Sequence, residues 1–159
     1  MKHLPKHLQP RWRYLAVAIE AWPDATVDRD EFQRALWYGA QNLLGDVGSS
    51  ALDLSVVQFR YSDGAGEALV RTRRGEVDRA RAVLACVGEV GSRPVGLQVL
   101  GVGGTVRACE EKYMKRGRED PEQRYVVFGD AERTGYVRDG SVDVRTGEGF
   151  AGATTLECQ

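Results

Sequence analysis

The stretch RWRYLAVAIEA, residues 11–21, places two arginines and two aromatic residues directly before an alternating apolar run. Leu15, Val17 and Ile19 are separated by small or charged residues, a period of two that is typical of a strand buried on one face. A Pro-Asp pair follows this run and is expected to end it. We therefore predict a strand here whose three large apolar side chains point into a core.

The same patterns predict further elements along the chain. A first helix is expected to begin at a capping Asp28, with Glu31 completing a capping box, and to end at Gly45. Its apolar stripe consists of Phe32, Leu36, Tyr38 with Gly39, and Leu43. The other predicted elements are strands at 52–61, 67–74 and 94–102, a helix over 77–87, and a last helix that Thr105 caps and that carries Val106, Cys109 and Tyr113.

The predicted order is β-α-β-β-α-β with an extra helix, the split βαβ pattern of ferredoxin-like and RNA-recognition-motif folds. Such an α/β chain (an α+β sandwich) covers one face of an antiparallel sheet with two helices and is expected to leave the other face open. We assign this core to residues 1–116. The remaining 117–159 read as an acidic extension of short strands, either a small β-meander or a partly mobile segment.

Charge is divided unevenly along the 159 residues. Residues 1–118 hold 18 Lys and Arg against 14 Asp and Glu, whereas residues 119–159 hold 4 against 9. A basic body with an acidic tail often marks a protein that binds nucleic acid or a partner. Of the 22 basic residues 18 are Arg, whose planar guanidinium suits phosphate, although base composition or a high-salt habitat biases usage in the same direction.

Other bulk features exclude several classes of protein. No apolar run reaches the length of a membrane span, so no membrane contact is expected. The three cysteines, Cys86, Cys109 and Cys158, have no C-x-x-C pairing. This pattern argues against a disulfide framework or a cysteine zinc site and favours a cytoplasmic location.

The open face of the predicted sheet combines aromatic and basic side chains. Strand alternation turns Trp12 and Tyr14 away from the core, beside Arg71 and Arg73 of the adjacent third strand. Bases stack on aromatic rings for about 1–3 kcal/mol each, so this face could bind RNA. An extra helix or a partner subunit could equally cover it, and the third strand, EALVRTRR, lacks the aromatic residue of the RNA-recognition consensus.

Two further stretches have both a functional and a structural interpretation. TRRGEVDRAR (residues 72–81) is either a patch for the phosphate backbone or a solvated strand end and helix face. GVGGTVRACEEKY (residues 101–113) is either an anion-holding turn at a helix start or a tight turn with Thr105 as its cap.

No catalytic or metal-binding constellation emerges from the sequence. His3 and His7 are the only histidines, and Pro5 between them keeps them off a shared helical face. We therefore expect no catalytic residue, no metal ligand and no cofactor in this chain.

Three stretches in series resemble the archaeal ribonuclease P protein component 2 family. They are RWRYLAV, ALVRTRRGEVDRARAVLACV and VGLQVLGVGGTVRACEEKY, which together span about residues 1–116. The arginine-rich, lysine-poor usage resembles a haloarchaeal member. The family often has Ser before the Gly-Thr of the last helix, where this chain has Gly103, and the resemblance does not extend to the acidic tail.

The resemblance implies an RNA-recognition-motif-like fold and a noncatalytic protein subunit of ribonuclease P, a ribonucleoprotein endonuclease that removes the 5′ leader from precursor tRNA. Its RNA subunit is expected to hold Mg²⁺ and make the cut. The expected partners are ribonuclease P RNA, protein component 3 and other ribonuclease P proteins, with precursor tRNA contacted indirectly. Trp12 is expected to contact RNA or a partner, and the predicted RNA contacts are Arg11, Arg13, Tyr14, Arg71, Arg73, Arg74, Arg107 and Lys112.

Two alternatives remain at this point. A stand-alone RNA-binding module would bind single strands through its open sheet face without any partner. A ferredoxin-like regulatory domain would bind a small molecule instead.

Overall fold

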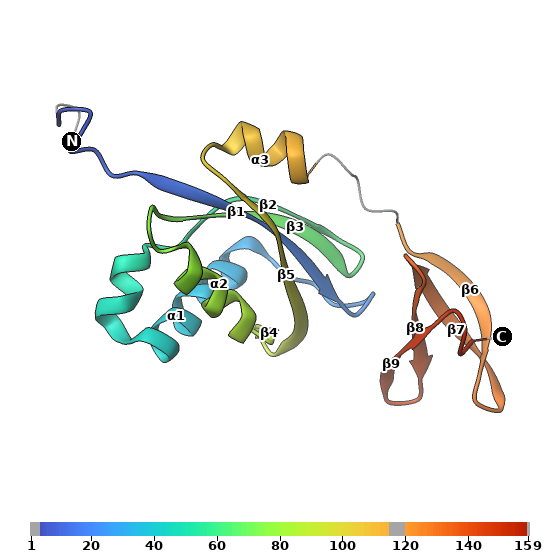
Figure 1. Ribbon diagram of the computed structural model, residues 1–159. Coiled ribbons are helices and arrows are strands. Elements are labelled where there is room, and N and C mark those ends of the chain that lie inside the picture. The colour runs from blue at the N-terminus through green and yellow to red at the C-terminus, as the bar shows by residue number, and fades with distance from the viewer. Residues whose placement is uncertain (1–3, 115–119, 159) are drawn as a thin grey trace.

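The computed structural model describes residues 4–114 and 120–158 (Figure 1). The elements in chain order are β1 (Trp12–Ala21), α1 (Arg29–Leu52), β2 (Ser55–Ser62), β3 (Ala65–Arg73), α2 (Val77–Cys86), β4 (Glu89–Val90), β5 (Arg93–Gly103), α3 (Val106–Tyr113), β6 (Glu122–Phe128), β7 (Ala131–Arg138), β8 (Ser141–Thr146) and β9 (Gly149–Thr154). The predicted boundary at residue 116 lies outside the described residues. No described helix is both long and apolar enough to cross a membrane.

The main sheet has the strand order β2-β3-β1-β5-β4 with antiparallel neighbours. The predicted ferredoxin-like arrangement is confirmed, since β1 and β3 are the central pair and β5 takes the place of the fourth strand. Helices α1 and α2 cover one face (Figure 1). The two-residue strand β4 was not predicted, because two residues are too few to show a period.

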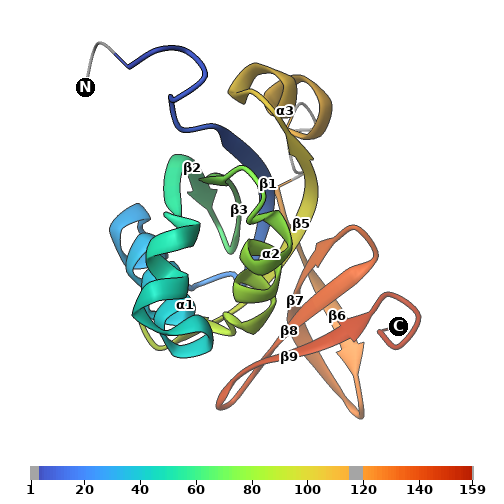
Figure 2. The same ribbon diagram turned by 60° about the vertical axis from the view of Figure 1, so that its left-hand side comes forward.

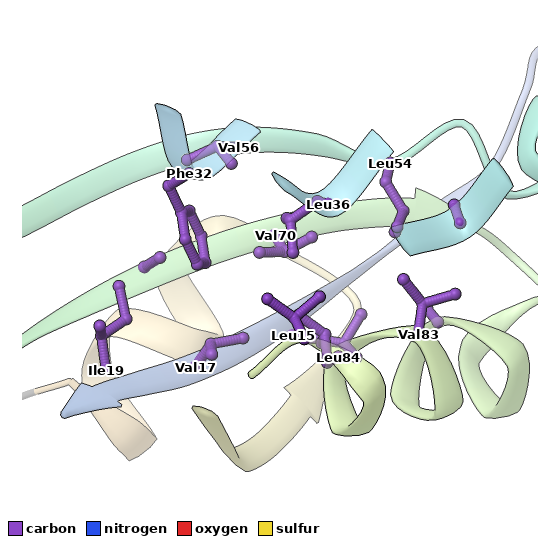
Figure 3. Close-up of a cluster of buried hydrophobic side chains, with 14 of the residues drawn as sticks. Leu15, Val17, Ile19, Phe32, Leu36, Leu54, Val56, Val70, Val83 and Leu84 are labelled. Carbon is purple, nitrogen blue, oxygen red and sulfur yellow. The ribbon is translucent and has the colours of Figure 1, made fainter. Parts of the chain in front are cut away.

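The main core lies between this sheet and helices α1 and α2 (Figure 3). Leu15, Val17 and Ile19 are fully buried, as the alternation of the first strand predicts. They meet Phe32 of α1 and Leu84 of α2. The apolar side chains of the first strand therefore pack against the apolar stripes of the two helices.

Helix α1 departs from its prediction at the C-terminal end. Gly45 adopts φ 71° and ψ −179°, which interrupts the helix but does not end it, and the chain continues in helical conformation to Leu52. Leu52 is fully buried and Leu54 nearly so, so core packing favours the second helical segment. The following strand consequently begins at Ser55 rather than at residue 52.

The start of α1 confirms one capping prediction and corrects the other. The Asp28 carboxylate accepts hydrogen bonds from the backbone N–H groups of Asp30 and Glu31, at 2.7 and 2.9 Å. The Glu31 side chain does not close a capping box. It pairs instead with Arg93 of β5 at 2.8 Å, which ties the helix to the sheet.

The second face of the sheet is covered at its centre instead of open, which agrees with the alternative of an extra helix that the sequence left open. Helix α3 packs on it, opposite α1 and α2 (Figure 2), and buries Ala16 and Leu69 completely against Cys109 and Met114. Glycine is required beneath this helix, because a Cβ at Gly103 would lie 2.6 Å from the Cys109 Sγ. The extra helix thus takes the position that a single-stranded RNA occupies on an open sheet.

The short strands predicted in the acidic tail are present and form a second sheet with the order β6-β7-β8-β9. Val126, Val142 and Val144 make a small core of its own. It contacts the main sheet's hairpin end, where Trp22 stacks on Phe150 with ring centroids 5.8 Å apart. Arg138 also donates a hydrogen bond to the Asp63 carbonyl at 2.9 Å.

Replacing Phe32 with Ala should lower the free energy of unfolding by about 3–5 kcal/mol, because a fully buried ring leaves a cavity between α1 and the sheet. Urea denaturation in the salt that keeps the chain folded measures this loss. Tyr38→Ala on the same helix is the control. Its side chain is exposed, so a change within about 0.5 kcal/mol is expected. Equal losses for the two variants would contradict the assigned core.

A second prediction concerns the close contact under α3. Gly103→Ala should destabilise the chain by about 1–3 kcal/mol through overpacking against Cys109. Adding Cys109→Ala removes the opposing sulfur, so the double variant should be more stable than the sum of the single effects. Gly96→Ala is the control, since a Cβ there would reach only the Glu20 carbonyl at 4.0 Å. Strictly additive effects would show that this contact does not position α3.

Candidate RNA interface

The predicted RNA-contacting side chains lie at one end of the main sheet. Here β1 begins, β3 ends and β5 leads into α3. The register pairs Trp12 with Arg73 and Tyr14 with Arg71. The Arg74 backbone N–H donates to the Arg11 carbonyl at 2.9 Å, which continues the pairing beyond the strands. We call this region the basic end; it comprises Arg11, Trp12, Arg13, Tyr14, Arg71, Arg73 and Arg74.

Trp12 organises two arginines of the basic end. The Arg71 Cζ lies 4.0 Å and the Arg73 Cζ 4.8 Å from the centre of its ring. Each cation–π contact contributes about 0.5–2 kcal/mol and leaves guanidinium N–H groups available to other acceptors. Arg73 also bonds to Asp53, the residue that ends α1, at 3.3 Å. Two planar cations are thereby held ready before any ligand arrives.

The basic end does not form one flat platform. Alternation along β1 and β3 puts Trp12, Arg71 and Arg73 on the face that carries α3, and Arg13 on the face of the main core. Thr72, which pairs with Arg13, is buried and donates its hydroxyl to the Leu52 carbonyl at 2.9 Å. The predicted cations therefore wrap around the edge of the sheet, in a shape that fits a phosphate backbone better than a row of stacked bases.

Tyr14 has a structural role that its sequence context did not reveal. Its ring is only partly exposed and packs with the cluster beneath α3. Its carbonyl accepts a hydrogen bond from the Cys109 thiol, with 3.4 Å between oxygen and sulfur. Burial raises the pKa of this thiol, and a hydrogen bond at Gly103 partly offsets the shift. The thiol thus stays protonated and serves as a donor.

Helix α3 borders the basic end with its own cations. Thr105 accepts from the Ala108 N–H at 3.1 Å, which confirms the predicted cap. Arg107 is highly exposed and pairs with Glu111 at 2.8 Å, and the Lys112 ammonium lies 5.4 Å from the Tyr113 ring. The tight-turn interpretation explains Gly103, because the space of a side chain there is filled by Cys109.

The structure exposes an apolar surface on α1 that the sequence analysis assigned to the core. Tyr38 is 63% and Leu43 45% exposed, and both belonged to the predicted buried stripe. Trp37 is 49% and Val47 86% exposed on the same helix. The adjacent Trp37 and Tyr38 offered a weak signal, because together with Phe32, Leu36 and Leu43 they make the apolar residues of this helix cover more than one face. We call these four residues the α1 patch.

Trp37 and Tyr38 of the α1 patch line a hollow that reaches Arg73 of the basic end. This hollow is lined by residues of α1 together with Leu54 and Arg73. The Trp37 indole N–H donates to the Leu54 carbonyl at 2.9 Å, which fixes the ring at the rim. Exposed aromatic side chains at the rim of a hollow are typical of protein interaction sites.

Within residues 4–114 and 120–158, no group of three or more His, Cys, Asp and Glu side chains could hold a metal ion. The three cysteines are free thiols. His3, one of the two histidines considered for metal binding, lies outside the described residues.

Comparison with known proteins places these features in context. The sequence model of the Rpp14/Pop5 family matches residues 13–114. Ribonuclease P protein component 2 of Natronomonas pharaonis is 59% identical over 157 residues, covering 99% of this chain and 98% of that protein. The protein of the same name from Halorubrum lacusprofundi is 56% identical over the whole of both chains. A chain in the cryo-EM structure of yeast ribonuclease MRP aligns with a TM-score of 0.48 and 13% identity, covering 63% of this chain and 79% of that one.

Proposed function

The chain belongs to the Rpp14/Pop5 family, and we propose that it is a protein subunit of ribonuclease P that assists a catalytic RNA in removing the 5′ leader from precursor tRNA. The observation that carries this proposal is the match, over almost the full length of both chains, to proteins named ribonuclease P protein component 2. The acidic extension is included in those matches. We assign the cleavage chemistry and its Mg²⁺ to the RNA subunit, and to this chain the binding of that RNA.

The RNA contact is proposed at the basic end. Arg71 and Arg73 lie against Trp12 and can each present two N–H groups to a phosphate oxygen pair. Arg11, Arg13 and Arg74 add charge around the same edge, and Arg107 and Lys112 extend it along α3. Binding through phosphates explains how a sheet face sealed by α3 still serves an RNA partner, because the contact needs no exposed stacking surface.

Protein component 3 and other ribonuclease P proteins are the proposed protein partners. We place their docking at the α1 patch, where two aromatic and two aliphatic side chains of one helix are exposed. Aromatic residues in such patches contribute most of the binding energy at protein interfaces. The hollow shared with Arg73 brings this surface next to the RNA contact, so one particle can engage both. Precursor tRNA is then reached through the assembled RNA, in the cytoplasm.

Omission tests the proposed function directly. Ribonuclease P reconstituted with cognate RNA and component 3 should cleave precursor tRNA more slowly, or need more Mg²⁺, when this chain is left out. Single-turnover cleavage over a magnesium series measures both quantities. Identical rates and identical magnesium requirements with and without the chain would contradict the proposal.

The basic end is tested by Arg71→Ala combined with Arg73→Ala. Affinity for the ribonuclease P RNA should fall at least ten-fold. The slope of log K against log salt should become shallower by about 2, since each lost phosphate contact contributes about 0.9. Arg60→Ala combined with Arg124→Ala removes the same charge from exposed ion pairs elsewhere. An equal loss in this control would show that net charge, and not the basic end, determines binding.

The α1 patch is tested by Tyr38→Ala combined with Val47→Asp, two exposed positions whose replacement leaves the core intact. Association with component 3, followed by calorimetry, should weaken at least ten-fold while RNA binding stays unchanged. Leu156→Asp, at an equally exposed apolar position of the C-terminal segment, is the matched control. Unaltered association for the double variant would exclude this patch as the docking surface.

A further inference from the structure

A cleft lies between the main sheet and the C-terminal sheet. It is at the opposite end of β1 from the basic end. Its walls come from the end of β1, the start of β5, the start of β8 and the end of β9, and it encloses about 500 Å³. Trp12 and Glu20 lie eight residues apart on β1, roughly 26 Å at the rise of an extended strand. The cleft is therefore a separate surface from the basic end.

Most of the side chains that line the cleft are small or apolar, and the charged ones are all acidic. It is lined by no Lys or Arg side chain among the described residues, whereas three carboxylates reach it. Glu157 is already engaged, since it accepts from the Thr154 N–H and hydroxyl at 2.8 and 2.9 Å. The side-chain carboxylates of Glu20 and Asp143 form no hydrogen bond or salt bridge with a described residue, and Asp143 is influenced only at longer range by Arg138.

Glu20 and Asp143 repel each other across the cleft. Burial raises the pKa of Asp143, the Glu20 carboxylate raises it further, and the Arg138 guanidinium acts in the opposite direction. A cation placed between the two carboxylates would relieve this repulsion, whereas a phosphate would increase it.

A partly free strand edge borders the same cleft. The β5 residues at the cleft are already paired on their outer side, since β4 pairs with Arg93 and Pro94 and the Gly88 carbonyl accepts from the Val95 N–H at 3.0 Å. Strand β9 is the last strand of its sheet, and although Thr154 bonds to Glu157 and Cys158, Gly152 has no partner strand on its outer side among the described residues. Unpaired edges offer N–H and C=O groups to an added strand, with side-chain pockets supplying the specificity.

The two glycines in the cleft leave room for such a strand. A Cβ at Gly152 would meet no atom within 4 Å, and one at Gly96 would reach only the Glu20 carbonyl at 4.0 Å. Neither backbone has a positive φ, so these glycines are not there for turn geometry. They keep the space between the two sheets empty.

We propose that this cleft binds an extended protein segment that carries one Arg or Lys among small apolar residues. The segment lies along the β9 edge beside Gly152, its cation sits between Glu20 and Asp143, and its apolar side chains contact Trp22 and Val95. The C-terminal sheet thereby supplies one wall of a second protein-docking surface.

The probe for this site is the acetylated peptide Ser-Val-Thr-Arg-Val-Thr-Ser, compared with the same peptide carrying neutral citrulline in place of Arg. Both are titrated into the isotope-labelled full chain and followed by NMR. The Arg peptide should shift the backbone amides of residues 95–96 and 152–154 in a saturable manner. The citrulline peptide should bind at least ten-fold more weakly.

Matched variants separate the cleft from the rest of the surface. Gly152→Leu fills the open space and should abolish the shifts, and Glu20→Gln should weaken binding of the Arg peptide alone. Gly147→Leu, at a β8–β9 turn position whose added Cβ also meets nothing, should leave binding unchanged. Three results would overturn the proposal: no saturable shift at these amides, equal binding of the two peptides, or shifts that survive Gly152→Leu. A uridine oligonucleotide that moves the same amides would overturn it as well.

Discussion

Burial of β1 on both of its faces is the constraint on which the remaining structure depends. Residues 15–19 are each at most 2% exposed, with α1 and α2 packed on one side and α3 on the other. A strand sealed in this way can contribute polar chemistry only at its two ends. The cations therefore gather where β1 begins, and the carboxylate-lined cleft lies where it finishes.

Helix α3 covers one face of the sheet. This chain therefore differs from RNA-binding sheets whose exposed face stacks on bases. Ala16 and Leu69 occupy central positions on that face and are fully covered. The covering helix fits because β5 carries glycine at position 103 beneath Cys109, and the Cys109 thiol reaches back to β1. The RNA contact that we propose accordingly depends on arginines at an edge, which would bind the phosphate backbone rather than identify bases.

The fold was largely predictable from the sequence because its signals are local. Alternation in β1, the Asp28 and Thr105 caps, and the strand order all follow from neighbouring residues. The unpredicted parts depend on distant ones. Whether Gly45 ends a helix or merely kinks it is decided by the burial of Leu52, and β4 exists only through its pairing with β5. At the site, the charge and spacing of residues along the sequence predicted the basic end. The cation–π contacts of Trp12 and the exposure of Tyr38 could be seen only in the three-dimensional structure.

The distance between the two ends of β1 makes their electrostatic interactions independent of each other. At roughly 26 Å the arginine-rich edge and the acidic cleft are separated by more than two Debye lengths at 0.1 M salt, and by far more in concentrated brine. Each end therefore responds to its own ligand without sensing the charge of the other. On the two proposals together, one small polypeptide acts as an adaptor with oppositely charged ends. It binds a polyanion at one end while a cationic protein segment binds at the other.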